Sequence, residues 1–302
     1  MLRRVTRHLL GTLLLLTASS IAFAQADPPG RVARISFISG SVSFRPVSID
    51  EWSPATLNYP ATIGDHVWLE NAARTELEWG ATAVRLGPRT EISLLNLDDR
   101  SAQVRMTQGV MIVNVRALAQ DETIEIDTPN GAVSLLRPGT YRIDVSENGD
   151  RSIVTVRHGE GELMAATSIT RIGDGMSVVA TGVDVPQTAM NAAPRIDEFE
   201  DWSLVRDRRY VTAQSSRYVP AEMIGYADLD QNGDWRDAPE YGSVWIPRVR
   251  AEWVPYRFGH WRCNRERSRA ADRIQSCRDS HWTARGHSLC AAGGADCDDA
   301  CV

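Results

Sequence analysis

Short runs of alternating apolar and polar residues dominate the chain from about residue 30 to residue 182. Examples are RVARISFI, ETIEIDT, TYRIDVS and SIVTVRHG, and turn dipeptides such as Asn130-Gly131 and Asn148-Gly149 separate the runs. A period of two residues with many Val, Ile, Thr and Tyr is typical of half-buried strands. The pattern predicts an all-β domain over residues 25–182, with about a dozen short strands in a sandwich or a solenoid-like stack.

The alternation stops at residues 183–194, VDVPQTAMNAAP, which we interpret as a linker. Residues 195–211 then place Ile196, Phe199, Trp202 and Val205 three apart, with acidic residues leading and arginines trailing. This order complements the helix dipole. The segment is therefore predicted to form one amphipathic helix whose apolar stripe packs against a neighbouring sheet.

From Tyr218 to Trp261 the composition shifts to Trp, Tyr, Pro and Gly, in pieces such as NGDWRDAPEYGSVWIP and AEWVPYRFGHW. Aromatic residues flanked by Pro and Gly predict short stacked hairpins, so residues 195–261 are expected to form a helix plus a Trp-rich hairpin domain. Aromatic side chains bury a large area while fixing few rotatable bonds, which favours them at contact surfaces. Six of them are candidate binding residues, with packing inside their own hairpins as the alternative: Trp235, Tyr241, Trp245, Trp253, Tyr256 and Trp261.

Residues 1–24 contain three arginines, the apolar run Leu9 to Leu16 and the ending Ala22-Phe23-Ala24. This arrangement predicts a cleavable secretory signal peptide, with a mature chain that begins near Gln25. An uncleaved anchor is the alternative, although the apolar core is short for a membrane span. The mature chain is expected to lack a transmembrane span and to be periplasmic or secreted.

Residues 262–302 contain all five Cys of the chain but few large aliphatic residues. Such a segment buries too little apolar surface to offset its ordering entropy, so we expect a disordered tail. Disulfides and a metal site are alternatives, although only Cys297 and Cys301 approach the spacing of zinc ligands. The abrupt change of composition after Trp261 also suggests a shift of reading frame there.

The stretch DLDQNGD at residues 228–234 has the order of acidic and amide residues that opens a calcium loop. Position 12 of such a loop should be a bidentate Glu, but Pro239 occupies it and Glu240 comes one residue late. Asn-Gly is a strong turn dipeptide, and Asp230 and Asp234 are placed to cap backbone amides. We interpret the stretch as a turn between strands and expect no metal site, with a weak calcium site of another type as the alternative.

The 33 basic residues, all of them Arg, face 39 acidic residues, which gives a formal net charge of −6. An acidic chain without a basic run argues against nucleic acid as a partner. The sequence has no G-x-S-x-G, no H-E-x-x-H and no phosphate-binding Gly loop. We therefore expect no enzyme, no catalytic residues and no cofactor.

Residues 30–165 resemble the FecR-type sensor domain family. The resemblance rests on Gly64-Asp65 before a strand, on Leu86 and Thr90, on the turn TPNG at residues 128–131 and on GTY at residues 139–141. It implies an envelope-facing β domain for protein contacts or ligand sensing. The best-known members carry an anti-sigma segment and a membrane helix ahead of this domain. Here the predicted signal peptide stands in their place, so we do not carry the anti-sigma role over.

Residues 195–261 resemble an uncharacterised Trp, Gly and Pro-rich domain that follows FecR-type domains in exported bacterial proteins. Together these features predict a non-catalytic module that binds or signals in the cell envelope, with an envelope protein or a polysaccharide as its partner. The alternative is a cell-surface structural or glycan-binding protein, in which tryptophans of the second domain stack on sugar rings.

Overall fold

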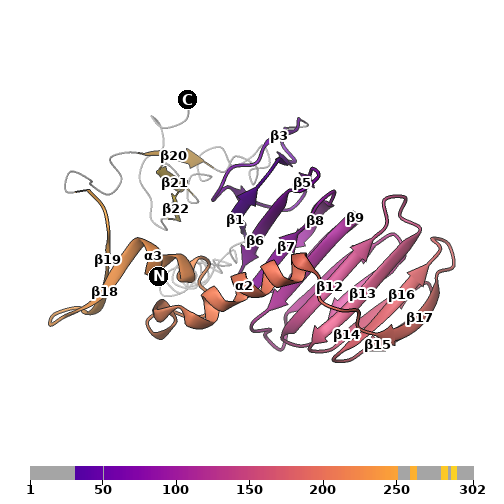
Figure 1. Ribbon diagram of the computed structural model, residues 1–302. Coiled ribbons are helices and arrows are strands. Elements are labelled where there is room, and N and C mark those ends of the chain that lie inside the picture. Colours follow the sequence, from indigo (N-terminus) through magenta and orange to yellow (C-terminus); the bar gives the residue numbers. More distant parts are fainter. Residues whose placement is uncertain (1–30, 50, 251–258, 264–279, 285–286, 291–302) are drawn as a thin grey trace, which may run out of the picture.

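The computed structural model describes residues 31–49, 51–250, 259–263, 280–284 and 287–290. Its largest part is a β-sandwich whose two sheets share one long strand (Figure 1). Helix α2 (Glu198–Thr212) runs across the outer face of one sheet. We call that layer the covered sheet and the other layer the open sheet.

Each sheet has nine strands, and β9 is counted in both. The covered sheet has the order β4 (Pro60–Ala61), β1 (Ala33–Ser39), β6 (Arg74–Trp79), β7 (Thr82–Leu86), β9 (Ser101–Val115), β12 (Gly139–Val145), β13 (Arg151–His158), β16 (Met176–Thr181), β17 (Gln187–Ala192). The open sheet has the order β3 (Ser53–Pro54), β2 (Val42–Arg45), β5 (His66–Leu69), β8 (Glu91–Leu97), β9, β10 (Thr123–Thr128), β11 (Gly131–Leu135), β14 (Gly161–Ala165), β15 (Ser168–Ile172). Among these pairs only β9 and β10 are parallel.

Strand β9 passes from one sheet to the other at Gly109. Residues before it pair with β8 and β10 in the open sheet, and residues from Gly109 onward pair with β12 and β7 in the covered sheet. Gly109 has a φ of 102°, in the left-handed region that favours glycine. A Cβ atom at this position would lie 2.4 Å from the Cα of Thr90. The fold therefore depends on a glycine at the bend that joins its two layers.

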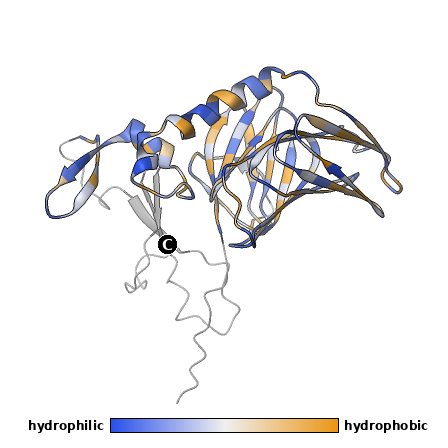
Figure 2. Ribbon diagram, turned by 90° about the horizontal axis from the view of Figure 1, so that it is seen from below, coloured by the Kyte–Doolittle hydropathy of each residue, from blue (hydrophilic) through white to orange (hydrophobic). Residues whose placement is uncertain are grey.

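The hydrophobic core lies between the sheets. Leu77 and Val113 of the covered sheet and Leu94 and Ile126 of the open sheet are fully buried within it. Figure 2 shows apolar and polar residues alternating along the strands, as expected where one face of a sheet is buried. Burial of one such side chain stabilises the fold by about 1.5–3 kcal/mol, so this alternation supplies most of the driving force.

The chain continues from β17 into α2, a 3-10 turn (Gln214–Arg217), helix α3 (Tyr226–Asn232) and the hairpin of β18 (Gly233–Ala238) and β19 (Gly242–Pro247). Strands β20 (Gly259–Cys263), β21 (Ser280–Ala284) and β22 (His287–Cys290) form a further antiparallel sheet. Among the described residues, no helix has both the length and the hydropathy that crossing a membrane requires.

The predicted fold class, an all-β domain followed by a helix and a Trp-rich hairpin, is confirmed. Of the two predicted architectures, the structure has the sandwich rather than the solenoid-like stack. The sandwich has 17 strands rather than about a dozen, because several have only two to four residues. The predicted linker was wrong in part, since residues 183–194 contain β17, which pairs with β16 along its whole length.

Three further predictions differ from the structure. The helix begins at Glu198 rather than residue 195, and Ile196 and Val205 of its expected apolar stripe are 51% and 57% exposed. Asn232-Gly233 is not a hairpin turn but the junction of α3 and β18, and the hairpin turns instead between Ala238 and Gly242. Strands β21 and β22 lie within the expected disordered tail, most of which is outside the described residues, as are residues 1–24.

Candidate functional site

Helix α2 packs on a charged surface rather than an apolar one. Side chains alternate along β6, so Leu77 points into the core while Glu76 and Glu78 point outward to the helix. Arg85 of β7 points the same way. Both Glu76 and Arg85 have no exposed side-chain surface. The helix therefore covers the charged outer face of the two central strands.

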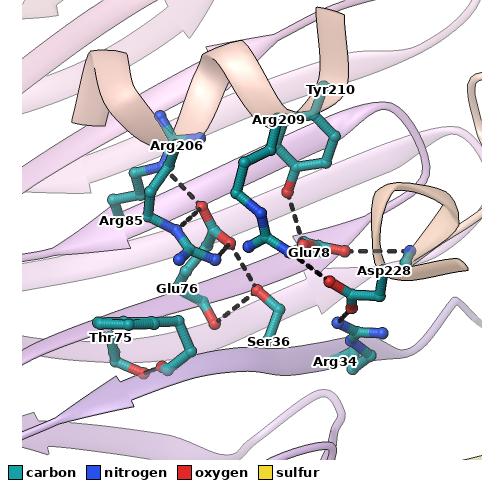
Figure 3. Close-up of polar contacts among 12 residues, drawn as sticks. Arg34, Ser36, Thr75, Glu76, Glu78, Arg85, Arg206, Arg209, Tyr210 and Asp228 are labelled. Atoms are coloured by element: carbon teal, nitrogen blue, oxygen red, sulfur yellow. Dashed lines mark hydrogen bonds and ion pairs between the residues drawn. The ribbon is translucent and has the colours of Figure 1, made fainter. Parts of the chain in front are cut away.

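Glu76 is the centre of this network (Figure 3). Arg85 Nε donates to Glu76 Oε2 at 2.7 Å, and Arg206 Nε donates to the same oxygen at 2.9 Å. Arg206 Nη2 also donates to Oε1, and this oxygen accepts a second bond from Ser36 Oγ at 2.8 Å. On its other side, Arg85 Nη1 lies 2.6 Å from Asp207 of α2. The two guanidinium groups and Glu76 are thus buried together, with the partly exposed Asp207 beside them, and their opposite charges compensate one another as buried charges require.

Glu78 links the end of α2 to the start of α3. Tyr210 Oη donates to Glu78 Oε1 at 2.5 Å, and the backbone N–H of Gly225 donates to Oε2 at 3.2 Å. The Arg116 guanidinium lies over the Tyr210 ring, 4.1 Å from its centroid. Tyr210, Ala83 and Tyr226 form a small apolar cluster beside these groups. One carboxylate therefore fixes two successive helices on the sandwich.

The first turn of α2 is held by a second group of ion pairs. Arg157 donates to both carboxylate oxygens of Glu200 at 2.7 Å, and Arg142 Nη1 donates to Asp197 at 2.6 Å. Asp197 is also the N-cap residue, since its side chain accepts the N–H of Glu200 at 2.9 Å. The acidic residues at the start of this helix thus meet arginines of β12 and β13.

Apolar contacts add little to this interface. Trp202 lies 5.4 Å from Phe37 and 5.5 Å from Phe199, measured between ring centroids. The Arg206 guanidinium lies 4.5 Å from the Phe37 centroid. Of the predicted apolar stripe, only Phe199 is buried and Trp202 partly buried. Charged and polar groups dominate the remaining contact.

Burial and neighbouring charges shift the pKa values of three residues in this interface: Glu76, Asp207 and Tyr210. Burial alone would raise the pKa of Glu76, but hydrogen bonds and charges from Arg206 and Arg85 outweigh it and hold the pKa at about 2. Burial raises the pKa of Asp207, opposed by the nearby charge of Arg85. Burial, followed by the charge of Glu78, raises the pKa of Tyr210. Perturbed groups of this kind occur at functional sites and in structural ion networks alike. Because these groups are buried against one another, we assign them the second role: they fix α2 and α3 on the sandwich.

The acidic stretch at residues 228–234 is used for contacts within the chain. Asp228 accepts from Arg209 at 2.5 Å and from Arg34 of β1. Asp230 accepts the N–H groups of Gln214 and Ser215 at 2.5 and 3.0 Å. It therefore caps backbone amides, although those of the 3-10 turn rather than of a hairpin. The described residues contain no group of three or more His, Cys, Asp or Glu that is placed to hold a metal ion.

Two of the predicted binding residues anchor the β18–β19 hairpin, and a third is at its tip. Trp235 and Trp245 are opposite each other in the register. Trp235 Nε1 donates to Ser215 Oγ at 2.8 Å, and Trp245 Nε1 donates to the carbonyl of Leu229 at 3.1 Å. Tyr241 lies in the turn and is 79% exposed. Trp253 and Tyr256 lie outside the described residues, and of Trp261 only its place in β20 is described.

Sequence reasoning did not single out Tyr218, which belongs with this group. Its ring stacks on that of Trp235, with centroids 4.4 Å apart and planes 17° apart, and the residue is 46% exposed. The sequence feature that could have pointed to Tyr218 is its position two residues before Pro220, at the start of the Trp-rich region. The structure thus places Tyr218 and Trp235 together at the base of the hairpin, with Tyr241 at its tip.

Comparison with known families identifies the central part of the sandwich. Residues 67–160 match the FecR protein family. This FecR domain spans the strands from β5 to β13, which include the bent strand β9 and both charged strands under α2. The FecR part of the predicted two-part resemblance is confirmed.

Residues 226–282 match a second model, a family of unknown function named DUF6600. The match begins at the first residue of α3 and continues beyond Trp261, which counts against a change of reading frame directly after that residue. The Trp-rich part of the predicted resemblance is confirmed, but its boundaries differ from residues 195–261.

No curated protein matches the chain. Among solved structures, the chain is similar to two crystal structures of a "putative anti-sigma factor" from Parabacteroides distasonis. The first is 14% identical, with 42% of this chain and 59% of that chain covered; the second is 12% identical, with 61% and 99% covered. Both have a TM-score of 0.38, so neither likeness establishes a shared fold or role.

Proposed function

We propose that this chain is an exported, non-catalytic module that binds a protein of the cell envelope through the aromatic hairpin of β18 and β19. The FecR match supports a regulatory or signalling role. In this proposal the FecR domain is the rigid base. The predicted signal peptide at residues 1–24 would deliver the chain to the envelope, and the catalytic motifs sought in the sequence are absent from it.

The observation that carries the proposal is the exposure of Tyr241 at the end of an anchored hairpin. The side chains of Trp235 and Trp245 hold the hairpin to the 3-10 turn and to α3 by hydrogen bonds. Asp228 of α3 in turn pairs with Arg34 of the sandwich. An aromatic residue that is presented on a fixed support loses little further entropy on binding, which is the condition for strong contact residues.

A polysaccharide is the second candidate partner, because of the Tyr218–Trp235 stack. The outer ring of this stack belongs to a residue that is 46% exposed, so an aromatic plane is open to a sugar ring. Binding of the purified protein to peptidoglycan or polysaccharide, compared with Tyr218→Ala, distinguishes this candidate from a protein partner.

Crosslinking in intact cells followed by pulldown tests the main proposal. Tyr241→Ala should weaken capture of the partner by about 1–4 kcal/mol and leave the melting temperature unchanged. Val211→Ala is the matched control, because Val211 is 84% exposed on the outer side of α2. Equal recovery by the wild type and Tyr241→Ala, or no partner above background, would contradict the proposal.

Export is tested separately by the intact mass of protein recovered from the cell envelope. We expect a chain that begins at Gln25. A mass that retains residues 9–16 would contradict the cleaved signal peptide, without bearing on the hairpin.

A further inference from the structure

Three of the four edge strands of the sandwich are protected against pairing with another chain. Strands β3 and β4 have two residues each, and each includes a proline. Edge strand β15 carries Arg171, which pairs with Glu162 at 2.8 Å. Short strands, prolines and charged side chains are the usual means by which a sheet edge avoids a partner.

The fourth edge, β17, has none of these protections. Its six residues, QTAMNA, are uncharged and contain no proline, and all six are exposed. Within the described part of the chain, β17 pairs with β16 on one side only. Its free edge lies at the end of the covered sheet farthest from the β18–β19 hairpin (Figure 1).

The register identifies the backbone groups on this free edge. Ala193 N–H donates to the carbonyl of Gly175, and the antiparallel pairing continues from Met176 opposite Ala192. Because alternate residues of an antiparallel ladder bond to the neighbouring strand, Gln187, Ala189 and Asn191 bond to β16. The N–H and C=O groups of Thr188 and Met190 therefore point away from the sheet, as does the N–H of Ala192. The Ala192 carbonyl accepts a long hydrogen bond from Ser177 Oγ at 3.5 Å.

Single opposite charges flank the strand. Asp184 precedes β17 and Arg195 follows it, both are exposed, and neither makes an ion pair within the described part of the chain. In an antiparallel pair of identical strands, the start of one strand lies beside the end of the other. Asp184 lies in the loop of residues 182–186 that joins β16 to β17. Two antiparallel copies of β17 would thus bring this loop of each copy to the end of the second copy's strand, toward its Arg195, whereas a parallel arrangement would bring like charges together.

We propose that the protein forms a two-fold symmetric dimer in which β17 pairs antiparallel with β17 of a second copy. The axis passes at Met190, so that Thr188 lies opposite Ala192 of the second copy. A shift of the axis to Ala189 would make Pro186 the partner of Ala192, a position that must donate an N–H, which proline lacks. With the axis at Met190, Pro186 instead faces Pro194, and both prolines lie outside the strand. The covered sheets of the two copies then form one continuous sheet, with an isologous contact of the kind typical of dimers.

The contact is small, since six residues pair, and interfaces of this size belong to weak complexes. We therefore expect association that depends on concentration over roughly 1–100 µM. The dimer would leave its two β18–β19 hairpins free at opposite ends. The inference does not rest on the proposed function, and failure of either leaves the other intact.

Analytical ultracentrifugation of the purified protein across this range tests the proposal. The wild type should shift from monomer to dimer. Met190→Pro removes an N–H of the free edge, where proline is tolerated, and should give only monomer, whereas Met190→Leu keeps the N–H and should associate like the wild type. Circular dichroism melts show whether the proline variant remains folded.

Charge exchange provides a test that does not depend on the proline variant. Asp184→Arg and Arg195→Asp should each weaken the dimer by roughly five- to tenfold, because each places two like-charged pairs across the axis. The double variant Asp184→Arg/Arg195→Asp should restore wild-type association. A monomeric wild type at about 100 µM, a dimer that persists in folded Met190→Pro, or a double variant no better than the single ones would overturn the proposal.

Discussion

Arg206 of helix α2 and Glu76 of strand β6 are 130 residues apart in sequence, and they form a buried, bidentate ion pair. Arg85 shares the same carboxylate, so removal of either arginine leaves its partners only partly compensated. The pair joins the helix to the FecR domain at the middle of their contact. The strength of this ion pair therefore measures how firmly helix α2 is held on the sandwich.

Arg206→Met should lower the free energy of unfolding by about 3–5 kcal/mol, because it removes one member of a buried pair and leaves Glu76 with a single guanidinium. Urea unfolding measures the change. Arg208→Met is the matched control, since Arg208 is exposed on the same helix, and it should change stability by less than about 0.5 kcal/mol. Equal stability of the two variants would show that α2 is held by other contacts.

Acid should weaken the protein through Glu76. Its folded-state pKa of about 2 lies below the ordinary value of 4.5, so the folded state binds the proton less readily than the unfolded state. The resulting stabilisation, roughly 3 kcal/mol, is complete above about pH 4.5 and is lost as the pH falls toward 2.

Urea unfolding of the wild type and Glu76→Gln at several pH values between 7 and 2.5 checks this pH dependence. Other carboxylates titrate in both proteins, so the difference between the two curves isolates Glu76. The variant should be less stable at pH 7, and the gap should narrow as the pH falls below 4.5. A constant gap across this range would be inconsistent with the low pKa of Glu76.

The strands of the sandwich were predictable where one of their faces is buried. SIVTVRHG was expected to be a strand and corresponds to β13, whose alternate residues Ser152, Val154 and Val156 enter the core. Strand β17 was missed because both of its faces and its outer edge are exposed, so its side chains need not alternate. Periodicity reports burial, and an exposed edge strand leaves no such trace.

The position of helix α2 was predictable, but the face that it buries was not. Its three-residue apolar spacing pointed to Phe199 and Val205, yet the helix buries only Phe199 of these, together with Glu200, Arg206 and Tyr210. The reason lies more than 100 residues away, in the outward carboxylates of β6. No property of the helix sequence alone reveals those partners. The alternation of Glu with Leu in RTELEW was the only local sign that the outer face of β6 carries charge.

Gly109→Ala should destabilise the sandwich by roughly 3 kcal/mol or more, because it combines an unfavourable φ with a close approach to backbone. The new Cβ would lie 2.4 Å from Thr90 Cα, and Thr90 cannot move without disturbing its hydrogen bond to the Val110 carbonyl. Gly173→Ala serves as the control, because a Cβ atom added at Gly173 would meet no other atom within 4 Å. Its free energy of unfolding should stay within about 0.5 kcal/mol of the wild-type value. A Gly109 variant as stable as the control would show that β9 can bend without this glycine.

Calcium should leave the stability of the protein unchanged, because the oxygens of its acidic stretch are already engaged. Arg34 and Arg209 neutralise Asp228, while the Asp230 carboxylate accepts two backbone N–H groups and the hydroxyl of Ser215. A calcium ion would have to displace these contacts, and α3 does not supply the turn that a calcium loop requires. Thermal melts in calcium and in chelator should therefore coincide, since a ligand that binds the folded state would raise its melting temperature further as the ligand concentration increases. Asp230→Ala should lower stability by about 1–2 kcal/mol in both buffers, because it leaves the amides of the 3-10 turn without their cap. A melting temperature that rises with calcium concentration in the wild type and not in Asp230→Ala would instead identify a calcium site at this stretch.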